Sequence, residues 1–86
     1  MKIIFHRDFK KEYKKLGKNI RVHFQEQLVI FENNPFDPQL NNHPLKGKQN
    51  GLRSINITGD LRAVYEMVDD DFAHFIALGS HSNLYK

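Results

Sequence analysis

Cysteine and tryptophan are absent from the 86 residues, and proline occurs only three times. Without cysteine the chain has neither a disulfide framework nor a cysteine-based metal cluster, which fits a reducing compartment. Long apolar runs are missing too, because the N-terminal stretch M-K-I-I-F-H-R-D-F-K returns to charge after a few apolar residues. Such a stretch is too short for a signal peptide or a membrane span, so we expect a cytoplasmic protein with no membrane association.

Motifs for metals, phosphates and nucleophilic catalysis are also missing. The sequence contains no H-E-x-x-H, no C-x-x-C and no two histidines at helical i, i+4 spacing, so we expect no metal and no other cofactor. The stretch H-P-L-K-G-K-Q-N-G lacks the spacing of a phosphate-binding loop. No serine or cysteine stands in a nucleophile elbow.

Positive charge, in contrast, is concentrated near the N-terminus. The formal net charge is +3, and eight of the thirteen lysines and arginines fall within residues 1–21, opposed there only by Asp8 and Glu12. A basic face attracts a polyanion at long range, which makes Lys10 and Lys14 candidate RNA-binding residues. The alternative is an ordinary solvated helix face, and charge alone does not decide between the two.

Hydrophobic spacing predicts a single α+β domain over residues 1–86. Residues 2–5 are β-branched and aromatic, as in a short strand. Two amphipathic stripes follow, one from residue 7 up to Gly17 and one over 19–33, and each has the period of a helix. Because the glycine turn between them is short, we expect an antiparallel helical hairpin.

The last third of the chain predicts three strands, over residues 52–57, 61–68 and 72–78, joined by turns of hairpin length. The stretch before them, residues 36–51, reads as a loop because it is rich in Asn, Pro and Gly. The expected order is β-α-α-β-β-β, with the helices on one face of an antiparallel sheet. The second face would be open to solvent, so we expect any site there or at the sheet's rim.

Polar residues suited to RNA cleavage without a metal gather near the ends of the predicted strands. They are His43, Lys46, Arg53, Asn56, Asp60, Arg62, His81 and Tyr85. Such cleavage needs a base for the ribose 2′-hydroxyl proton, a cation for the phosphate charge and an acid for the departing 5′-oxygen. Taken singly, each of these residues also fits an ordinary turn, sheet-face or anchoring role.

Ordered motifs give the sequence a family resemblance. N-H-P-L-K-G, G-L-R-S-I-N-I, D-L-R-A-V-Y-E and L-G-S-H-S-N-L-Y, with the lysine-rich helical hairpin before them, resemble the RelE/ParE superfamily of bacterial toxins. The similarity is closest to the YafQ-like mRNA interferase branch. It implies a toxin of a type II toxin–antitoxin pair that cuts mRNA on the ribosome without a metal. The implied partners are a cognate antitoxin, translated mRNA, and operator DNA only through the antitoxin complex.

The resemblance also implies roles for individual residues. His81 is the candidate general acid, and either Asp60 or His43 is the candidate base. Arg62 matches an arginine that related toxins use near the scissile phosphate, and Tyr85 matches a terminal aromatic residue that contacts substrate.

Phosphate contacts are assigned on the same basis to Lys46 and Arg53. The chain departs from the branch at three positions, where Asn56 replaces a second histidine, Leu61 a tryptophan and Ala77 an arginine. These departures keep an alternative open. The protein would then be a non-catalytic gyrase inhibitor of the ParE type, or a degenerate toxin that acts as an antitoxin partner and co-repressor.

Overall fold

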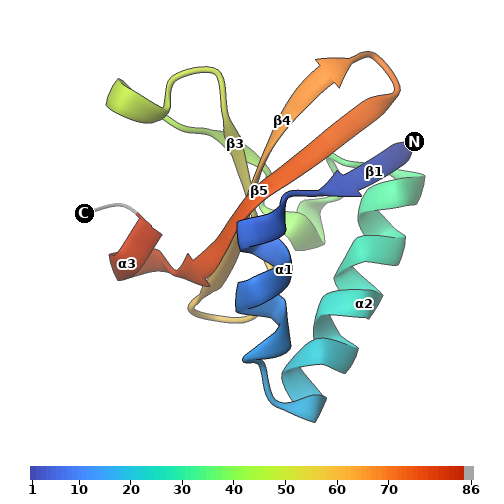
Figure 1. The fold of residues 1–86 in the computed structure, drawn as a ribbon. Helices are drawn as coiled ribbons and strands as arrows, with labels where there is room; N and C mark the ends of the chain where they lie inside the picture. Colours follow the sequence, from blue (N-terminus) through green and yellow to red (C-terminus); the bar gives the residue numbers. More distant parts are fainter. Residues whose placement is uncertain (85–86) are drawn as a thin grey trace.

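Two helices lie across one face of a five-stranded sheet in the computed structural model, which describes residues 1–84 (Figure 1). The elements in chain order are β1 (Lys2–Phe5), α1 (Arg7–Lys14), α2 (Lys18–Asn33), η1 (Pro38–Leu40), β2 (His43–Pro44), η2 (Gly47–Gln49), β3 (Arg53–Asn56), β4 (Leu61–Asp69), β5 (Phe72–Ser80) and α3 (His81–Leu84). The expected α+β fold, with its helical hairpin followed by antiparallel strands, is confirmed. Within residues 1–84 no helix has the length and apolarity needed to cross a membrane.

The sheet has the strand order β1-β5-β4-β3-β2. Strands β3 and β5 each pair with β4 in the antiparallel direction, as the short connections between these strands require. Strand β1 instead pairs in parallel with β5, from Lys2 opposite Phe72 to Phe5 opposite Phe75. The sheet is therefore mixed. A tight turn would force β1 to be antiparallel to its neighbour, but the two helices separate β1 from the other strands in the chain, so a parallel pairing is possible.

Two short elements lie where the sequence predicts a loop and a tail. Within the predicted loop, His43 pairs with Ser54 to form the two-residue strand β2, and the Leu45 amide donates to the Leu52 carbonyl at 2.9 Å. This pairing is tertiary, so local composition does not reveal it. The tail after β5 forms the short helix α3, which begins at His81.

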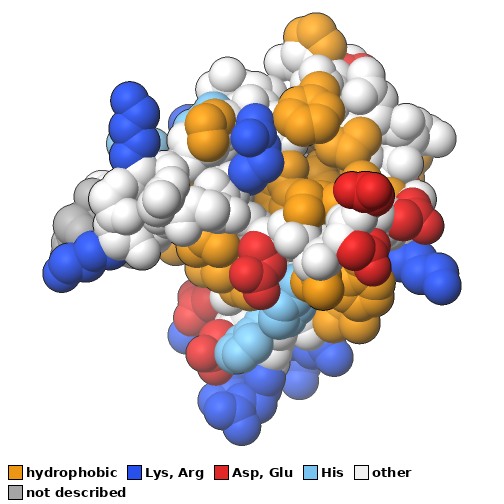
Figure 2. All heavy atoms as spheres, turned by 90° about the horizontal axis from the view of Figure 1, so that it is seen from above, with side chains coloured by type: hydrophobic (Ala, Val, Ile, Leu, Met, Phe, Trp, Pro, Cys, Tyr) orange, Lys and Arg blue, Asp and Glu red, His pale blue; other side chains and the backbone are white. Residues whose placement is uncertain are grey.

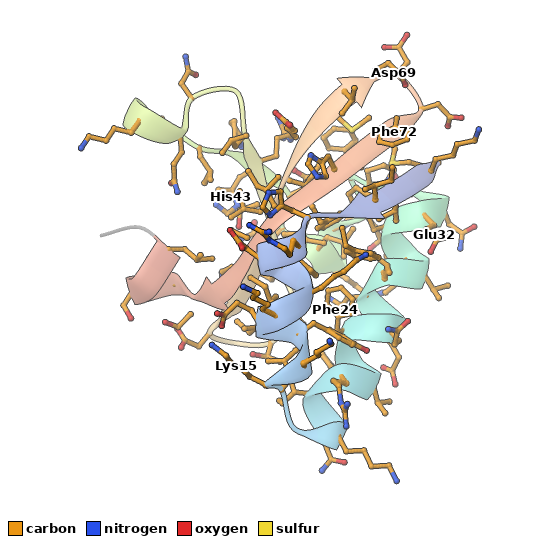
Figure 3. All side chains as sticks on the ribbon, in the orientation of Figure 1. Lys15, Phe24, Glu32, His43, Asp69 and Phe72 are labelled. Carbon is orange, nitrogen blue, oxygen red and sulfur yellow. The ribbon has the colours of Figure 1, made fainter. Side chains whose placement is uncertain are left out.

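Aromatic side chains fill the space between the helices and the sheet. Phe24, Phe31, Tyr65 and Phe75 are almost completely buried, and the rings of Phe31, Tyr65 and Phe75 contact one another with centroids 5.0 to 5.2 Å apart. Phe24 is labelled between the two helices in Figure 3. Each buried ring contributes about 1.5–3 kcal/mol of transfer free energy, so this cluster stabilises the packing of the helices on the sheet.

The strand register decides which side chains face away from the helices. Ile55, Ala63 and Leu78 are in register across β3, β4 and β5 and belong to the core. The residues next to them in each strand point to the far face. They form two rows: Ser54, Val64 and Ala77 in one, and Asn56, Arg62 and Gly79 in the other.

The far face is not fully open, which corrects the expectation of a solvent-exposed second face. Ser54 and Val64 lie on it and are fully buried. Leu84 packs against the same face, because a Cβ atom at Gly79 would lie 3.4 Å from its side chain. The chain therefore covers part of this face with its own C-terminal segment.

Candidate functional site

A hollow of about 550 Å³ lies beside the far face, where α3 approaches β2 and the loop that follows it. Its lining residues are His43, Pro44, Leu45, Lys46, Lys48, Gln49, His81 and Leu84. Two of the segments that contribute lining residues can be followed in Figure 1, where η2 lies at the upper left and α3 below it. The hollow is lined by both imidazoles that the motifs single out, together with two ammonium groups, and such a lining suits a polyanion.

His43 is held by its own strand and by the turn before it. Its Nδ1 lies 2.8 Å from the Asn41 carbonyl oxygen, in a turn where Asn41 has a φ of 47°, in the left-handed region that Asn tolerates. A carbonyl oxygen only accepts hydrogen bonds, so Nδ1 carries the hydrogen. The neutral ring then has its lone pair on Nε2, the nitrogen that can accept a proton.

His81 begins α3 directly after β5, with an exposed side chain. Its backbone amide donates to the Asp60 carbonyl at 3.0 Å, which joins the start of α3 to the turn between β3 and β4. Asp60 is therefore a neighbour of His81 through the main chain, although Asp60 does not line the hollow. The structure brings His43 and His81 to one hollow from segments far apart in the sequence.

Arg62 lies on the far face, but its guanidinium turns back to the β3–β4 turn. Its Nη1 donates to the carbonyls of Thr58 and Gly59 at 3.0 and 3.1 Å. In the neighbouring strand, Asn56 lies opposite Arg62, and the buried Asn56 Oδ1 has no hydrogen-bond partner among residues 1–84. Arg62 therefore supports the turn that carries Asp60, and its Nε and Nη2 groups have no hydrogen-bond partner among residues 1–84.

Arg53 lies on the opposite side of the sheet from the hollow. It is in register with the core residue Tyr65, its Nε donates to Asn42 Oδ1 at 2.7 Å, and its guanidinium lies 5.1 Å from the ring centroid of Phe36. These contacts make Arg53 part of a structural network. This orientation could have been predicted from the alternation of side chains along a strand, because Arg53 is two residues from the inward-facing Ile55.

The predicted RNA-binding lysines separate into two places. Lys46 lines the hollow, whereas Lys10 borders a different pocket of about 120 Å³ with aromatic side chains. Lys14 is an exposed residue at the end of α1 and does not line the hollow, and Figure 3 labels Lys15, which follows it directly. Tyr85 lies outside the described residues.

Two polar residues of the hollow, Lys48 and Gln49, were not among the predicted site residues. Lys48 had a signal, because K-G-K places a second ammonium group two residues from Lys46. Gln49 had none, because its Nε2 donates at 3.1 Å to the carbonyl of Leu84, 35 residues further along the chain.

A second histidine pair, His6 and His74, lies outside the lining of the hollow. Figure 2 shows histidine side chains next to acidic side chains on one face of the molecule. The rings of His6 and His74 are 5.9 Å apart, and His74 Nδ1 is 3.5 Å from a Glu66 carboxylate oxygen. The His6 Nδ1 accepts from the Asp8 amide at 3.0 Å, which caps α1. Across the described residues, no group of three or more His, Cys, Asp or Glu side chains is arranged to hold a metal ion.

Comparison with known proteins identifies similar chains. A family profile described as a bacterial toxin of type II toxin–antitoxin systems, YafQ, matches residues 1–86. A conserved protein of Helicobacter pylori with a solution structure is 35% identical, covers 99% of both chains and has a TM-score of 0.69. A search of curated protein sequences finds no match.

Two solved structures from E. coli share the fold. YafQ from strain BL21(DE3) is 22% identical, with a TM-score of 0.80, and the alignment covers 98% of this chain and 97% of that one. A chain of the DinJ–YafQ complex is 21% identical, with a TM-score of 0.68 and the same coverage of 98% and 97%.

Proposed function

Because this chain belongs to the YafQ family of bacterial toxins of type II toxin–antitoxin systems, we propose that it is a cytoplasmic endoribonuclease that cuts mRNA on the ribosome. The observation that supports this proposal most strongly is the hollow itself. It is lined by His43 and His81 together with the ammonium groups of Lys46 and Lys48. Acid, base and cation are the groups that cleavage through the ribose 2′-hydroxyl needs, and no metal step is required.

In the proposed reaction, His43 Nε2 takes the proton from the ribose 2′-hydroxyl, and the 2′-oxygen attacks the adjacent phosphorus. The bond from phosphorus to the 5′-oxygen breaks, and the His81 imidazolium gives its proton to that oxygen. The products are a 2′,3′-cyclic phosphate and a 5′-hydroxyl. His43 is favoured over Asp60 as the base because the Asn41 carbonyl holds its tautomer and because it lines the hollow, whereas Asp60 does not.

Lys46 and Lys48, which line the hollow, would be the first groups to stabilise the negative charge of the phosphate. Arg62 is a second source of positive charge on the far face, but its Nη1 already donates to two turn carbonyls. Only its other N–H groups can reach an anion without breaking these bonds. The position that the resemblance assigns to a further arginine holds Ala77, so the lysines carry more of this role here than in the branch.

A toxic nuclease needs restraint, so we include a cognate antitoxin as partner. The solved DinJ–YafQ complex is a precedent within the fold. An antitoxin segment that covered the hollow would block access to both imidazoles. Operator DNA would be bound only through the toxin–antitoxin complex.

The test of this proposal replaces His81 by Ala. We expect ribosome-dependent mRNA cleavage to slow by roughly 10²–10⁴-fold, the range for losing a general acid. His23→Ala is the matched control, because His23 is an exposed histidine of α2 that does not line the hollow. Equal cleavage by wild type and His81→Ala would remove His81 from the mechanism. Growth arrest with intact mRNA and inhibited DNA supercoiling would support the gyrase-inhibitor alternative instead.

A further inference from the structure

Helix α3 has only four residues, far fewer than an isolated helix needs in water. Contacts from three other parts of the chain hold it. The His81 amide donates to the Asp60 carbonyl at 3.0 Å, and the Leu84 side chain packs against Gly79. The third contact is the side-chain hydrogen bond from Gln49 Nε2 to the Leu84 carbonyl at 3.1 Å.

This third contact caps the helix. Carbonyl groups in the last turn of a helix have no partner within the helix, and the Leu84 carbonyl is one of them. Gln49 supplies the missing donor from 35 residues away, and the bond is partly buried. Removing this donor leaves the partly buried carbonyl without a partner among residues 1–84, which costs more than losing an exposed hydrogen bond.

The cap comes from a well-held loop. Gln49 is the last residue of η2, its carbonyl accepts from the Leu52 amide at 3.0 Å, and the Leu45 amide donates to the Leu52 carbonyl at 2.9 Å. The same loop carries Lys46 and Lys48 into the hollow. The hydrogen bond from Gln49 thus connects the loop that carries the two lysines to the helix that begins with His81.

We propose that Gln49 is a positioning residue that fixes α3, and with it His81, relative to the lysine loop before RNA binds. The effect on cleavage rests on the proposed function, whereas the effect on the position of α3 concerns the free protein. Pre-set geometry matters because an error of about 1 Å in the position of a catalytic group can cost about 10²-fold in rate. Gln49 would then raise the rate of the chemical step without adding affinity for RNA.

The first test measures amide hydrogen exchange by NMR in the free protein. Gln49→Met keeps the approximate length of the side chain but removes the donor. We expect the His81 amide to exchange roughly 3- to 10-fold faster, the loss that corresponds to about one net hydrogen bond. Core amides such as those of Ala63 and Phe75 should keep their protection. Asn50→Met is the matched control, because Asn50 lies next to Gln49 but has an exposed side chain that forms no hydrogen bond with the described residues of α3. Unchanged exchange at His81 in Gln49→Met would overturn the proposal.

The second test separates positioning from direct RNA contact. For ribosome-bound mRNA we expect Gln49→Met to lower kcat about tenfold or more while KM stays within about twofold. A raised KM with unchanged kcat would mean that the Gln49 amide binds RNA, and it would contradict the positioning role. If the wild-type protein cleaves no RNA, the proposed function fails, and the exchange measurement alone decides whether Gln49 holds α3.

Discussion

Asn42 is the polar residue near the hollow whose replacement we expect to destabilise the protein most. Its Nδ2 donates to the Pro35 carbonyl at 2.8 Å and to the Tyr65 hydroxyl at 2.6 Å, while its Oδ1 accepts from Arg53 Nε at 2.7 Å. It thereby joins the loop after α2 to β3 and β4, immediately before His43. Asn42→Ala removes all three bonds at once.

The expected cost follows from what each partner loses. Tyr65 is 1% exposed, so its hydroxyl is left without a partner in the protein and costs about 1–3 kcal/mol. Arg53 and Pro35 are half-buried, and water replaces part of what they lose, so we allow about 0.5–1 kcal/mol for each. We therefore expect Asn42→Ala to lower the free energy of unfolding by about 2–5 kcal/mol.

Urea unfolding followed by circular dichroism measures this change, with a lower midpoint and an unchanged m-value expected. Asn33→Ala is the control, because its side chain makes one exposed bond to the Val29 carbonyl, and its effect should stay within about 0.5 kcal/mol. In a Tyr65→Phe background the cost of Asn42→Ala should fall by about 1 kcal/mol, because the two share a hydrogen bond. A cost below about 1 kcal/mol for Asn42→Ala, or strict additivity with Tyr65→Phe, would refute the reasoning.

Three further predictions concern the hollow, the tail and the core. Lys46→Ala should weaken RNA binding at every sequence and flatten the slope of log K against log salt by about 0.7, as for one phosphate contact of a single strand; an unchanged slope would place Lys46 off the RNA path. A Cβ added at Gly79 would lie 3.4 Å from the Leu84 side chain, so the larger side chain of Gly79→Val should displace α3 and reduce cleavage more than it reduces stability. Matched losses in both assays would argue against that mechanism. Phe31→Ala should cost about 3–5 kcal/mol in urea unfolding, since Phe31 is 0% exposed, and a cost under 2 kcal/mol would mean that the core refills the space.

The element types could be predicted because local spacing reports burial. Phe24, Leu28 and Phe31 recur at helical spacing and all three are buried. Val22 and Val29 are apolar residues of the same helix, yet both are more than half exposed. Apolar spacing gives the direction of the buried stripe, whereas its width depends on what packs against it.

Contacts between distant segments could not be predicted in this way. The parallel pairing of β1 with β5, the two-residue strand β2 and the Gln49–Leu84 bond all join residues with no local signal for each other. Their partners are chosen by the packed structure. Sequence spacing defines neither the partner nor the register of such contacts.

For the candidate site, the structure brings two histidines and Lys46 from the motifs to one hollow, whereas the two arginines lie elsewhere. His43 and His81 belong to separate motifs and line the same hollow. Arg53 faces the helices and Arg62 holds a turn, because a guanidinium beside unsatisfied carbonyls or amides is readily used for structure. The assignments of these residues to catalysis or RNA binding remain predictions, and Tyr85 lies beyond the described residues.

The chemistry of the cut ends tests the central claim most directly. A translated mRNA whose cleavage site has been mapped would be prepared with a single 2′-deoxy nucleotide 5′ to the scissile phosphate, alongside an unmodified copy. The account predicts that the unmodified mRNA yields a 5′-hydroxyl and a 2′,3′-cyclic phosphate, and that the 2′-deoxy mRNA is not cut at that position. Cleavage of the 2′-deoxy mRNA at the same position, or products ending in a 5′-phosphate and a 3′-hydroxyl, would contradict attack by the 2′-oxygen.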